Sequence, residues 1–345
     1  MSLPRKLAGS TTRSGSHIVT KARGQEAAKH TEAFVAAGSK GRVGIIGLGI
    51  MGGAFARNLI ADGWNVAGVD TDPKRRKEMT KAGVSVSDSV KELVTAVPIV
   101  ITSLPSPKAL GAVAQEIAQS GAKPRIIIEA STFALDDKLA AESVVRKAGH
   151  TMLDCPVSGT GAQAARKDLV VYASGDRKAI EKAMPVFAGF SRKTENLGAF
   201  GNGSKMKYVA NLLVAIHNVA AAEAMVLGMK AGLEPEQIFK FANGGAGQSR
   251  MFEIRGPMMV ADDYSEATMK NYVWQKDMAV IGEFANKLGV PTPLFSATLP
   301  VYASAMSVGY AEQDTGAVCA VLERMAGVKR GKKSKTGKTK KKAKK

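Results

Sequence analysis

The chain has 345 residues, of which 45% are hydrophobic and 6% aromatic. This length exceeds one ordinary domain and favours two, and the hydrophobic content excludes a wholly disordered protein. The net charge of +19 is typical of nucleic-acid-binding proteins, but most of it lies at the two ends. Residues 1–40 carry seven Lys and Arg against two acids, and residues 329–345 carry eleven and no acid, so the body between them is nearly neutral.

The few cysteines and histidines limit the other classes. Cys155 and Cys319 make no disulfide framework, which indicates a reducing compartment and predicts a cytoplasmic location. The four histidines are scattered, so no metal site is expected. No apolar run approaches membrane-spanning length, and no membrane contact is expected. Residues 1–40 form a predicted disordered extension, with organelle import as the minority alternative because the segment is poor in acids and contains Arg.

A glycine-rich turn follows the first predicted strand, Val43–Ile46. The turn has the spacing G-x-G-x-x-G from Gly47 to Gly52, a helical segment follows it, and a second strand leads to Asp70. A strand, this turn, a helix and an acid about 20 residues later are the context that a dinucleotide site requires. Asp70 would bind the ribose hydroxyls of NAD and repel the 2′-phosphate of NADP, so NAD is preferred and NADP remains possible.

The pattern then alternates between strands and helices as far as residue 203. This order predicts an α/β fold, a Rossmann-type doubly wound and mostly parallel sheet with helices on both faces. Further strands are predicted at Asn65–Val69, Val84–Val86, Ile99–Ser103, Arg125–Glu129, Thr151–Leu153 and Leu169–Ala173. Helices are predicted at Met51–Ala61, Pro73–Ala82, Val90–Val94, Ala109–Gln119, Asp136–Ala148 and Lys178–Phe187.

The alternation of strand and helix patterns ends at Gly203, and one long helix, Ser204–Ala231, is predicted after it. It leads an all-α domain with helices at Pro235–Asn243, Phe252–Val260, Asn271–Leu288, Leu294–Val308 and Thr315–Met325. The predicted domains are thus 1–40, 41–203 (dinucleotide-binding), 204–327 (all-α) and 328–345 (a disordered Lys-rich tail). Helices with broad apolar faces often dimerise, so a homodimer or homotetramer is expected.

Four motifs in order resemble the β-hydroxyacid dehydrogenases, the family of 3-hydroxyisobutyrate dehydrogenase, tartronate semialdehyde reductase and threonate dehydrogenase. They are the glycine turn, the D-x-P-V-S-G run from Asp154 to Gly159, the G-x-G-x-x-x-K run ending at Lys207, and Lys276-Asp277. The resemblance spans residues 42–326. It implies an NAD(P)-dependent oxidoreductase that moves a hydride to or from a small 3-hydroxy acid.

The resemblance also assigns roles to residues. Lys207 is the expected general acid/base, paired with Asn211 four residues later on the same helix face, whereas Lys205 has a valine at that spacing. The expected substrate-binding residues are Ser131, Ser158 and Gly159. The expected cofactor-binding residues are Gly47, Leu48, Gly49, Ile50, Met51, Gly52, Asp70, Leu104, Pro105, Thr132 and Lys276.

The chain departs from the usual family pattern at Thr160, Gln163 and Lys167-Asp168, beside the expected substrate pocket, and this leaves the substrate open. The alternative function is an NAD-binding, non-catalytic protein attached to nucleic acid through Lys329–Lys345, a tail that lacks aromatic residues to stack bases. The presence of both Lys207 and Asn211 argues against that alternative. An imine or β-ketoacid reductase is a third possibility, and the lysine argues against imine reduction as well.

Overall fold

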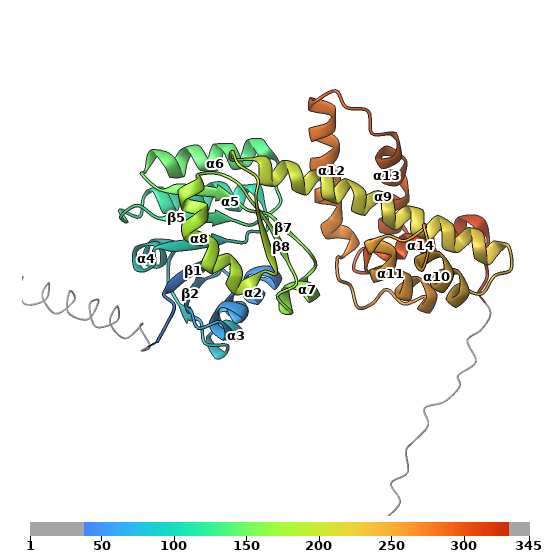
Figure 1. The fold of residues 1–345 in the computed structure, drawn as a ribbon, viewed down its shortest axis with the longest axis horizontal. Helices are drawn as coiled ribbons and strands as arrows, with labels where there is room; N and C mark the ends of the chain where they lie inside the picture. The colour runs from blue at the N-terminus through green and yellow to red at the C-terminus, as the bar shows by residue number, and fades with distance from the viewer. Residues whose placement is uncertain (1–37, 331–345) are drawn as a thin grey trace, which may run out of the picture. The chain divides into compact units, whose positions relative to one another are not determined.

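The computed structural model of the chain describes residues 38–330 (Figure 1). The predictions for residues 1–37 and 331–345, which cover nearly all of the N-terminal extension and most of the Lys-rich tail, lie outside the described residues. The chain divides into two compact units between Ser204 and Lys205. This point falls inside one long helix, α9, which spans Asn202–Lys230.

The first unit is built on a six-stranded parallel sheet with the order β3-β2-β1-β4-β5-β6. The expected Rossmann-type parallel sheet is therefore confirmed. Its strands are β1 (Arg42–Ile46), β2 (Asn65–Val69), β3 (Ser85–Val86), β4 (Ile99–Thr102), β5 (Ile126–Glu129) and β6 (Thr151–Asp154). The connecting helices are α2 (Ile50–Ala61), α3 (Pro73–Lys81), α4 (Val90–Ala96), α5 (Pro107–Ala118) and α6 (Leu135–Lys147).

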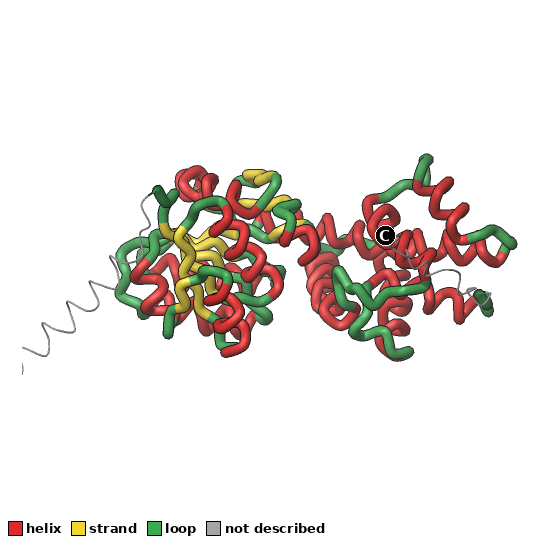
Figure 2. Tube along the Cα trace, turned by 90° about the horizontal axis from the view of Figure 1, so that it is seen from below, coloured by secondary structure: helices red, strands yellow, loops and turns green. Residues whose placement is uncertain are grey.

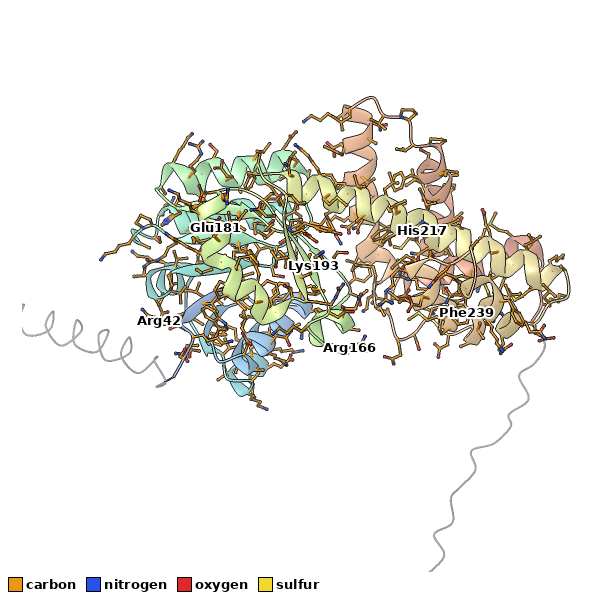
Figure 3. The ribbon with its side chains drawn as sticks, in the orientation of Figure 1. Arg42, Arg166, Glu181, Lys193, His217 and Phe239 are labelled. Carbon is orange, nitrogen blue, oxygen red and sulfur yellow. The ribbon has the colours of Figure 1, made fainter. Side chains whose placement is uncertain are left out.

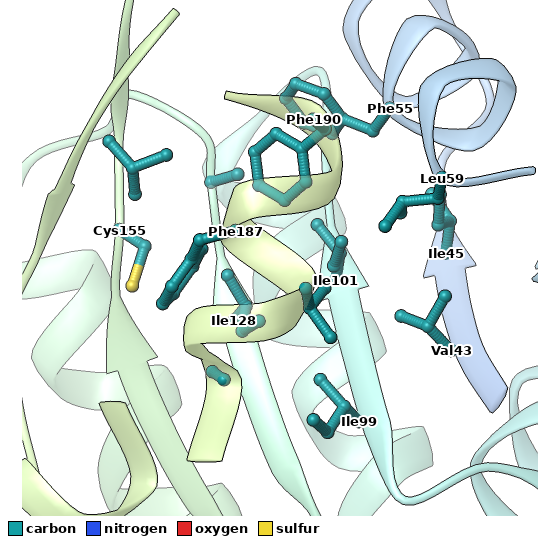
Figure 4. Packing of buried hydrophobic residues seen from close by; sticks show 14 of the residues in the cluster. Val43, Ile45, Phe55, Leu59, Ile99, Ile101, Ile128, Cys155, Phe187 and Phe190 are labelled. Carbon is teal, nitrogen blue, oxygen red and sulfur yellow. The ribbon is translucent and has the colours of Figure 1, made fainter. Parts of the chain in front are cut away.

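Both faces of this sheet are buried, which explains why its strands read as continuous apolar runs. On one face, side chains such as Val43 and Ile128 pack against α2 and against α8 (Arg177–Phe190), where Phe55 and Phe190 stack at 4.5 Å (Figure 4). On the other face, a second cluster packs under α4, α5 and α6. Ligand-binding loops therefore leave the unit at the carboxyl ends of the strands.

A second, three-stranded sheet was not expected from the sequence. It has the order β7-β8-β9, formed by β7 (Val157–Ser158), β8 (Val170–Ala173) and β9 (Lys193–Asn196). The strand predicted at Leu169–Ala173 exists, but it pairs antiparallel with β7 and parallel with β9 outside the large sheet. A five-residue helix, α7 (Gly161–Ala165), follows β7. Unlike β8, the elements β7, β9 and α7 are too short or too polar to give a periodic apolar signal.

Within the described residues, strands occur only in the first unit, and the second unit is helical (Figure 2). Besides most of α9 it contains α10 (Pro235–Asn243), α11 (Arg250–Ala261), α12 (Asn271–Lys287), α13 (Pro293–Ser307), a short 3-10 turn (Thr315–Ala317) and α14 (Val318–Ala326). One apolar cluster holds it together. For example, Phe239 of α10, labelled in Figure 3, meets Phe252 of α11 edge to face at 5.4 Å.

Helix α9 corrects the expectation that no apolar run approaches membrane-spanning length. By length and composition alone it could cross a membrane, with a mean hydropathy of 1.7 over its most apolar window. However, 44% of that window is buried inside the structure, and core helices pass the same test. Tyr208, Ala215 and Met225 of α9 belong to the apolar cluster of the second unit, so we describe α9 as a core helix.

Candidate active site

The glycine turn after β1 leaves no space for side chains at two of its positions. Gly47 has φ +91°, and a Cβ there would lie 2.2 Å from the carbonyl oxygen of Ser103. A Cβ on Gly52 would lie 1.9 Å from the carbonyl oxygen of Gly47. The turn and the start of α2 therefore pack directly on backbone, as the fingerprint requires.

The same turn is open where a phosphate would approach. A Cβ on Gly49 would meet no atom within 4 Å. Helix α2 has no side chain hydrogen-bonded to its N-terminus, so its first N–H groups and its positive dipole end are available to an anion. This cradle fits the pyrophosphate of a dinucleotide.

Asp70 lies at the carboxyl end of β2, beside the turn. Its Oδ2 accepts a hydrogen bond from the Leu48 N–H at 2.6 Å, and its Oδ1 accepts one from the Asp72 N–H at 2.8 Å. Each carboxylate oxygen can accept a further bond. Asp70 thus holds the glycine turn in place and keeps acceptor capacity for ribose hydroxyls.

Two more predicted contacts meet at the ends of β4 and β5. The Leu104 N–H donates to Ser131 Oγ at 2.9 Å, and the Ser131 N–H donates to Glu129 Oε1 at 2.9 Å. Pro105 and Thr132 follow directly in these two loops. The structure therefore joins the loop of Leu104 and Pro105, predicted to bind the cofactor, to the loop of Ser131 and Thr132 through the Ser131 hydroxyl.

Ser158 and Gly159 lie where β7 leads into α7. Gly159 has φ +138°, and a Cβ there would lie 2.4 Å from Leu169 Cδ2, so only glycine fits. The departures from the family pattern stabilise this loop internally. Thr160 and Gln163 form a capping box on α7, while Asp168 accepts hydrogen bonds from Gln163 Nε2 at 3.2 Å and Arg192 Nε at 2.9 Å.

The sequence did not indicate a buried ion network at the ends of β5 and β6. Lys138 Nζ lies 2.6 Å from Glu129 Oε2 and 2.8 Å from Asp154 Oδ1, and all three side chains are fully buried. Burial disfavours the charge on Lys138, but the charges of Asp154 and Glu129 outweigh burial and raise its pKa above the ordinary value. Lys138 lies in a segment rich in acids and alanine, which is typical of an exposed helix. The sequence therefore gave no indication that its side chain is buried.

In the second unit, the predicted acid/base pair lies on one face of α9. Lys207 is 8% exposed and Asn211 5%, whereas Lys205 is exposed. Asn211 Nδ2 donates to Asp277 Oδ2 of α12 at 2.9 Å, and Lys276 Nζ pairs with Asp277 Oδ1 at 2.8 Å. The structure therefore brings Asn211, Lys276 and Asp277 together.

The environment of Lys207 changes its acidity. Burial, opposed by the charge of Asp277 and assisted by that of Lys276, lowers the pKa of Lys207 to about 8. A lysine with such a pKa can exchange a proton near neutral pH. In residues 38–330, no group of three or more His, Cys, Asp and Glu side chains is placed to hold a metal ion.

Comparison with known proteins identifies both parts of the chain. Residues 42–198 match the family model of the NAD-binding domain of 6-phosphogluconate dehydrogenase. Residues 201–322 match the model described as the NAD-binding domain of NADP-dependent 3-hydroxyisobutyrate dehydrogenase.

The matches to individual relatives cover nearly the whole length of each relative. The chain is 31% identical to an L-threonate dehydrogenase of Cupriavidus necator, over 81% of this chain and 95% of the relative. It is 30% identical to an NAD-dependent L-serine dehydrogenase of Pseudomonas aeruginosa, over 80% and 96%. A Mycobacterium tuberculosis 3-hydroxyisobutyrate dehydrogenase solved with L-serine superposes with a TM-score of 0.76 at 27% identity, covering 82% of this chain and 99% of that one. Together with the glycine turn, these matches show that the chain belongs to the NAD(P)-dependent β-hydroxyacid dehydrogenase family.

Proposed function

We propose that this enzyme transfers hydride between NAD and a small 3-hydroxy acid, with Lys207 as the general acid/base. The observation that carries the proposal is the burial of Lys207 beside Asn211 and Asp277 in an environment that lowers its pKa to about 8. A solvated surface lysine would titrate near 10.4 and would exchange protons poorly at neutral pH.

The proposed mechanism assigns a separate role to each residue of the site. A nicotinamide cofactor held by the glycine turn and Asp70 would supply the hydride acceptor for oxidation and the hydride donor for reduction. The neutral Lys207 amine accepts the hydroxyl proton in oxidation, and the ammonium donates it in reduction. The hydrogen bond from Asn211 Nδ2 to Asp277 Oδ2 holds the amide in place, and its oxygen is the acceptor that Asn211 would offer to the substrate hydroxyl. Ser158, the Gly159 N–H and Ser131 bind the carboxylate, and this positions the reacting carbon.

The substrate class rests on the relatives, which are named for L-threonate, L-serine, glyoxylate or succinic semialdehyde, and 3-hydroxyisobutyrate. We propose a three- or four-carbon hydroxy acid of this kind. The decisive experiment is a screen of L-threonate, L-serine, glycerate and 3-hydroxyisobutyrate with NAD and with NADP, followed by NADH or NADPH absorbance. Absence of turnover with every acid would contradict the proposal.

We propose that NAD is preferred over NADP. The Asp70 carboxylate carries a negative charge beside the glycine turn, where a 2′-phosphate would have to lie. Lys74, Arg75 and Arg76 follow on α3, but Arg75 is paired with Glu78 at 3.0 Å. The same screen tests the preference, because kcat/KM for NAD should exceed that for NADP.

The pKa of Lys207 predicts the pH dependence of the reaction. Oxidation needs the neutral amine, so kcat/KM for the hydroxy acid should rise with pH through a midpoint near 8. Reduction needs the ammonium, so kcat/KM for the keto or semialdehyde partner should fall through the same midpoint. Initial rates between pH 6 and 10 in both directions measure these midpoints. If neither direction shows a midpoint near pH 8, Lys207 is excluded as the titrating group.

We also propose that the chain forms a homo-oligomer. Apolar side chains on α9, among them Met206, Val209, Leu213 and Leu227, are 39%, 53%, 47% and 73% exposed. The first three share a helix face by their spacing of three and four residues. Contiguous exposed apolar surface of this kind favours association. Light scattering coupled to gel filtration gives the mass, and a monomer at micromolar concentration would contradict the proposal.

For the Lys-rich tail we retain the proposal of contact with a polyanion such as nucleic acid. Arg330 lies within the segment 328–345 predicted to be disordered, but it packs on the second unit. Its Nη1 donates to the Val260 carbonyl at 3.0 Å and its Nε to Glu323 Oε2 at 2.9 Å. A deletion should therefore begin at residue 331. Charge-driven DNA binding should fall steeply with salt and vanish on this deletion.

The free buried thiols of Cys155 and Cys319 support a reducing location, and we propose the cytoplasm.

A further inference from the structure

The first turn of α9 is capped by the last residue of β6 and by Ser174, the residue that follows β8. The first N–H groups of a helix have no partner within the helix. Here the Gly203 N–H donates to Ser174 Oγ at 2.9 Å, and the Ser204 N–H donates to Asp154 Oδ2 at 2.7 Å. Ser204 Oγ also donates to Asp154 Oδ1 at 2.8 Å. Asp154, the last residue of β6, thus acts as the N-cap of a helix that begins 48 residues later.

The helix start also lies directly against strand backbone. A Cβ on Gly203 would lie 2.4 Å from the Tyr172 carbonyl oxygen and 2.6 Å from that of Asp154. Only glycine allows this approach, and Gly203 is the second glycine of the run that ends at Lys207. The orientation of the first turn is therefore specified by steric contact and by two charge-assisted hydrogen bonds.

Lys138 supplies the positive charge that both buried carboxylates face. Its Nζ lies 2.6 Å from Glu129 Oε2 and 2.8 Å from Asp154 Oδ1, and all three side chains are fully buried. Glu129 in turn accepts from the Ser131 N–H. One continuous chain of ion pairs and hydrogen bonds therefore runs from Ser131 through Lys138 to Ser204.

We propose that Lys138 is a positioning residue for the reaction: its charge holds Asp154 as the remote N-cap that orients the α9 turn immediately before Lys207. Ser204, Lys207 and Asn211 are three and four residues apart on one continuous helix and share one of its faces, so the anchor acts on the helix turn that precedes Lys207. Through Glu129 the same charge orients Ser131. The inference rests on the proposed role of Lys207.

The test compares Ser204→Ala and Lys138→Met with Ser191→Ala. Ser191 is a matched control, since it is a buried serine of the first unit whose Oγ donates to the Phe187 carbonyl at 2.8 Å, outside the network. Amide hydrogen exchange of the peptide covering residues 201–208 reports how firmly Asp154 holds the first turn of α9. Steady-state kinetics and the Kd for NADH report the effect on catalysis and on cofactor binding. Ser204→Ala retains every charge, so it stays informative where Lys138→Met fails to fold.

We expect exchange at residues 201–208 to accelerate about tenfold in Ser204→Ala and more in Lys138→Met. A misplacement of about 1 Å can cost about 100-fold in rate, so kcat should fall about 3- to 10-fold in Ser204→Ala and about 10- to 100-fold in Lys138→Met. In Ser204→Ala the Kd for NADH should stay within about twofold, because the glycine turn and Asp70 are untouched. Ser191→Ala should leave exchange of this peptide and kcat within about twofold.

Unchanged exchange at residues 201–208 in Ser204→Ala would overturn the proposal, and so would accelerated exchange with an unchanged kcat. A fall of kcat in Ser191→Ala equal to that in Ser204→Ala would also overturn it, because general destabilisation would then explain both. If the wild-type enzyme oxidises none of the acids, the proposed function fails, whereas the exchange measurement still decides whether the anchor exists.

Discussion

Lys207→Met is expected to lower kcat for hydroxy-acid oxidation by about 100- to 10,000-fold, the range for loss of a general acid/base. Methionine fills a similar volume but cannot accept or donate the proton. Asn211 and Asp277 keep their hydrogen bond to each other, so the KM for the hydroxy acid should change much less than kcat. Stopped-flow or steady-state NADH formation measures the loss.

The same substitution is expected to stabilise the fold. Lowering the pKa of Lys207 from 10.5 to about 8 means that the folded state bears a cost of up to about 3 kcal/mol for the buried ammonium. Because the folded pKa is depressed, this cost is complete below about pH 8 and disappears as the pH rises toward 10.5. Lys207→Met should therefore have a higher Tm than wild type at pH 7 and nearly the same Tm at pH 10.

Lys205→Met is the matched control, because Lys205 lies two residues earlier on the same helix and is exposed. It should keep kcat within about twofold and change the Tm little, as substitutions at exposed sites usually do. Near-wild-type turnover in Lys207→Met, or an equal loss in Lys205→Met, would remove Lys207 from the mechanism.

The parts of the fold that the sequence predicted are those with a local signal. The strands β1, β2 and β4 are continuous apolar runs, and the long helices begin at prolines or have apolar faces, so their ends were placed within a few residues. The second sheet could not be predicted, because β7 has two residues and the strand Lys193–Asn196 is entirely polar. Its stability comes from pairing with β8, which is a tertiary contact.

The candidate site divides in the same way. Lys207 and Asn211 could be predicted because four residues separate them on one helix and their spacing matches a family motif. Lys138 could not, because its partners lie 9 and 16 residues away on two different strands. The sequence showed Asp154 only as the first residue of the D-x-P-V-S-G motif. Its hydrogen bond to Ser204, 50 residues later, is a tertiary contact that forms only when the chain has folded.

Gly52→Ala and Gly49→Ala are expected to separate the two functions of the glycine turn. In Gly52→Ala the new Cβ meets the Gly47 carbonyl at 1.9 Å, and both positions are backbone that cannot rotate away. Overpacking of this kind typically costs about 1 to 3 kcal/mol, and here α2 must move off β1 as well. We expect the free energy of unfolding to fall by at least about 3 kcal/mol, with no measurable NADH affinity in the folded fraction.

Gly49→Ala should behave differently, because its Cβ meets no protein atom and its φ of −64° suits any residue. The free energy of unfolding should change by less than about 0.5 kcal/mol. The Kd for NADH should nevertheless rise at least about tenfold, since the methyl group occupies the space through which the backbone approaches the pyrophosphate. Urea unfolding and NADH fluorescence titration measure both quantities in each variant.

Gly111→Ala provides the control for introducing a methyl group. Gly111 lies inside α5 with no atom within 4 Å of the new Cβ, so alanine should stabilise the helix by about 0.5 to 1 kcal/mol and leave the Kd for NADH unchanged. If Gly49→Ala binds NADH as tightly as Gly111→Ala, the pyrophosphate does not approach Gly49. If Gly49→Ala instead loses as much stability as Gly52→Ala, the turn serves the fold at both glycines, and cofactor binding must be assigned to other residues.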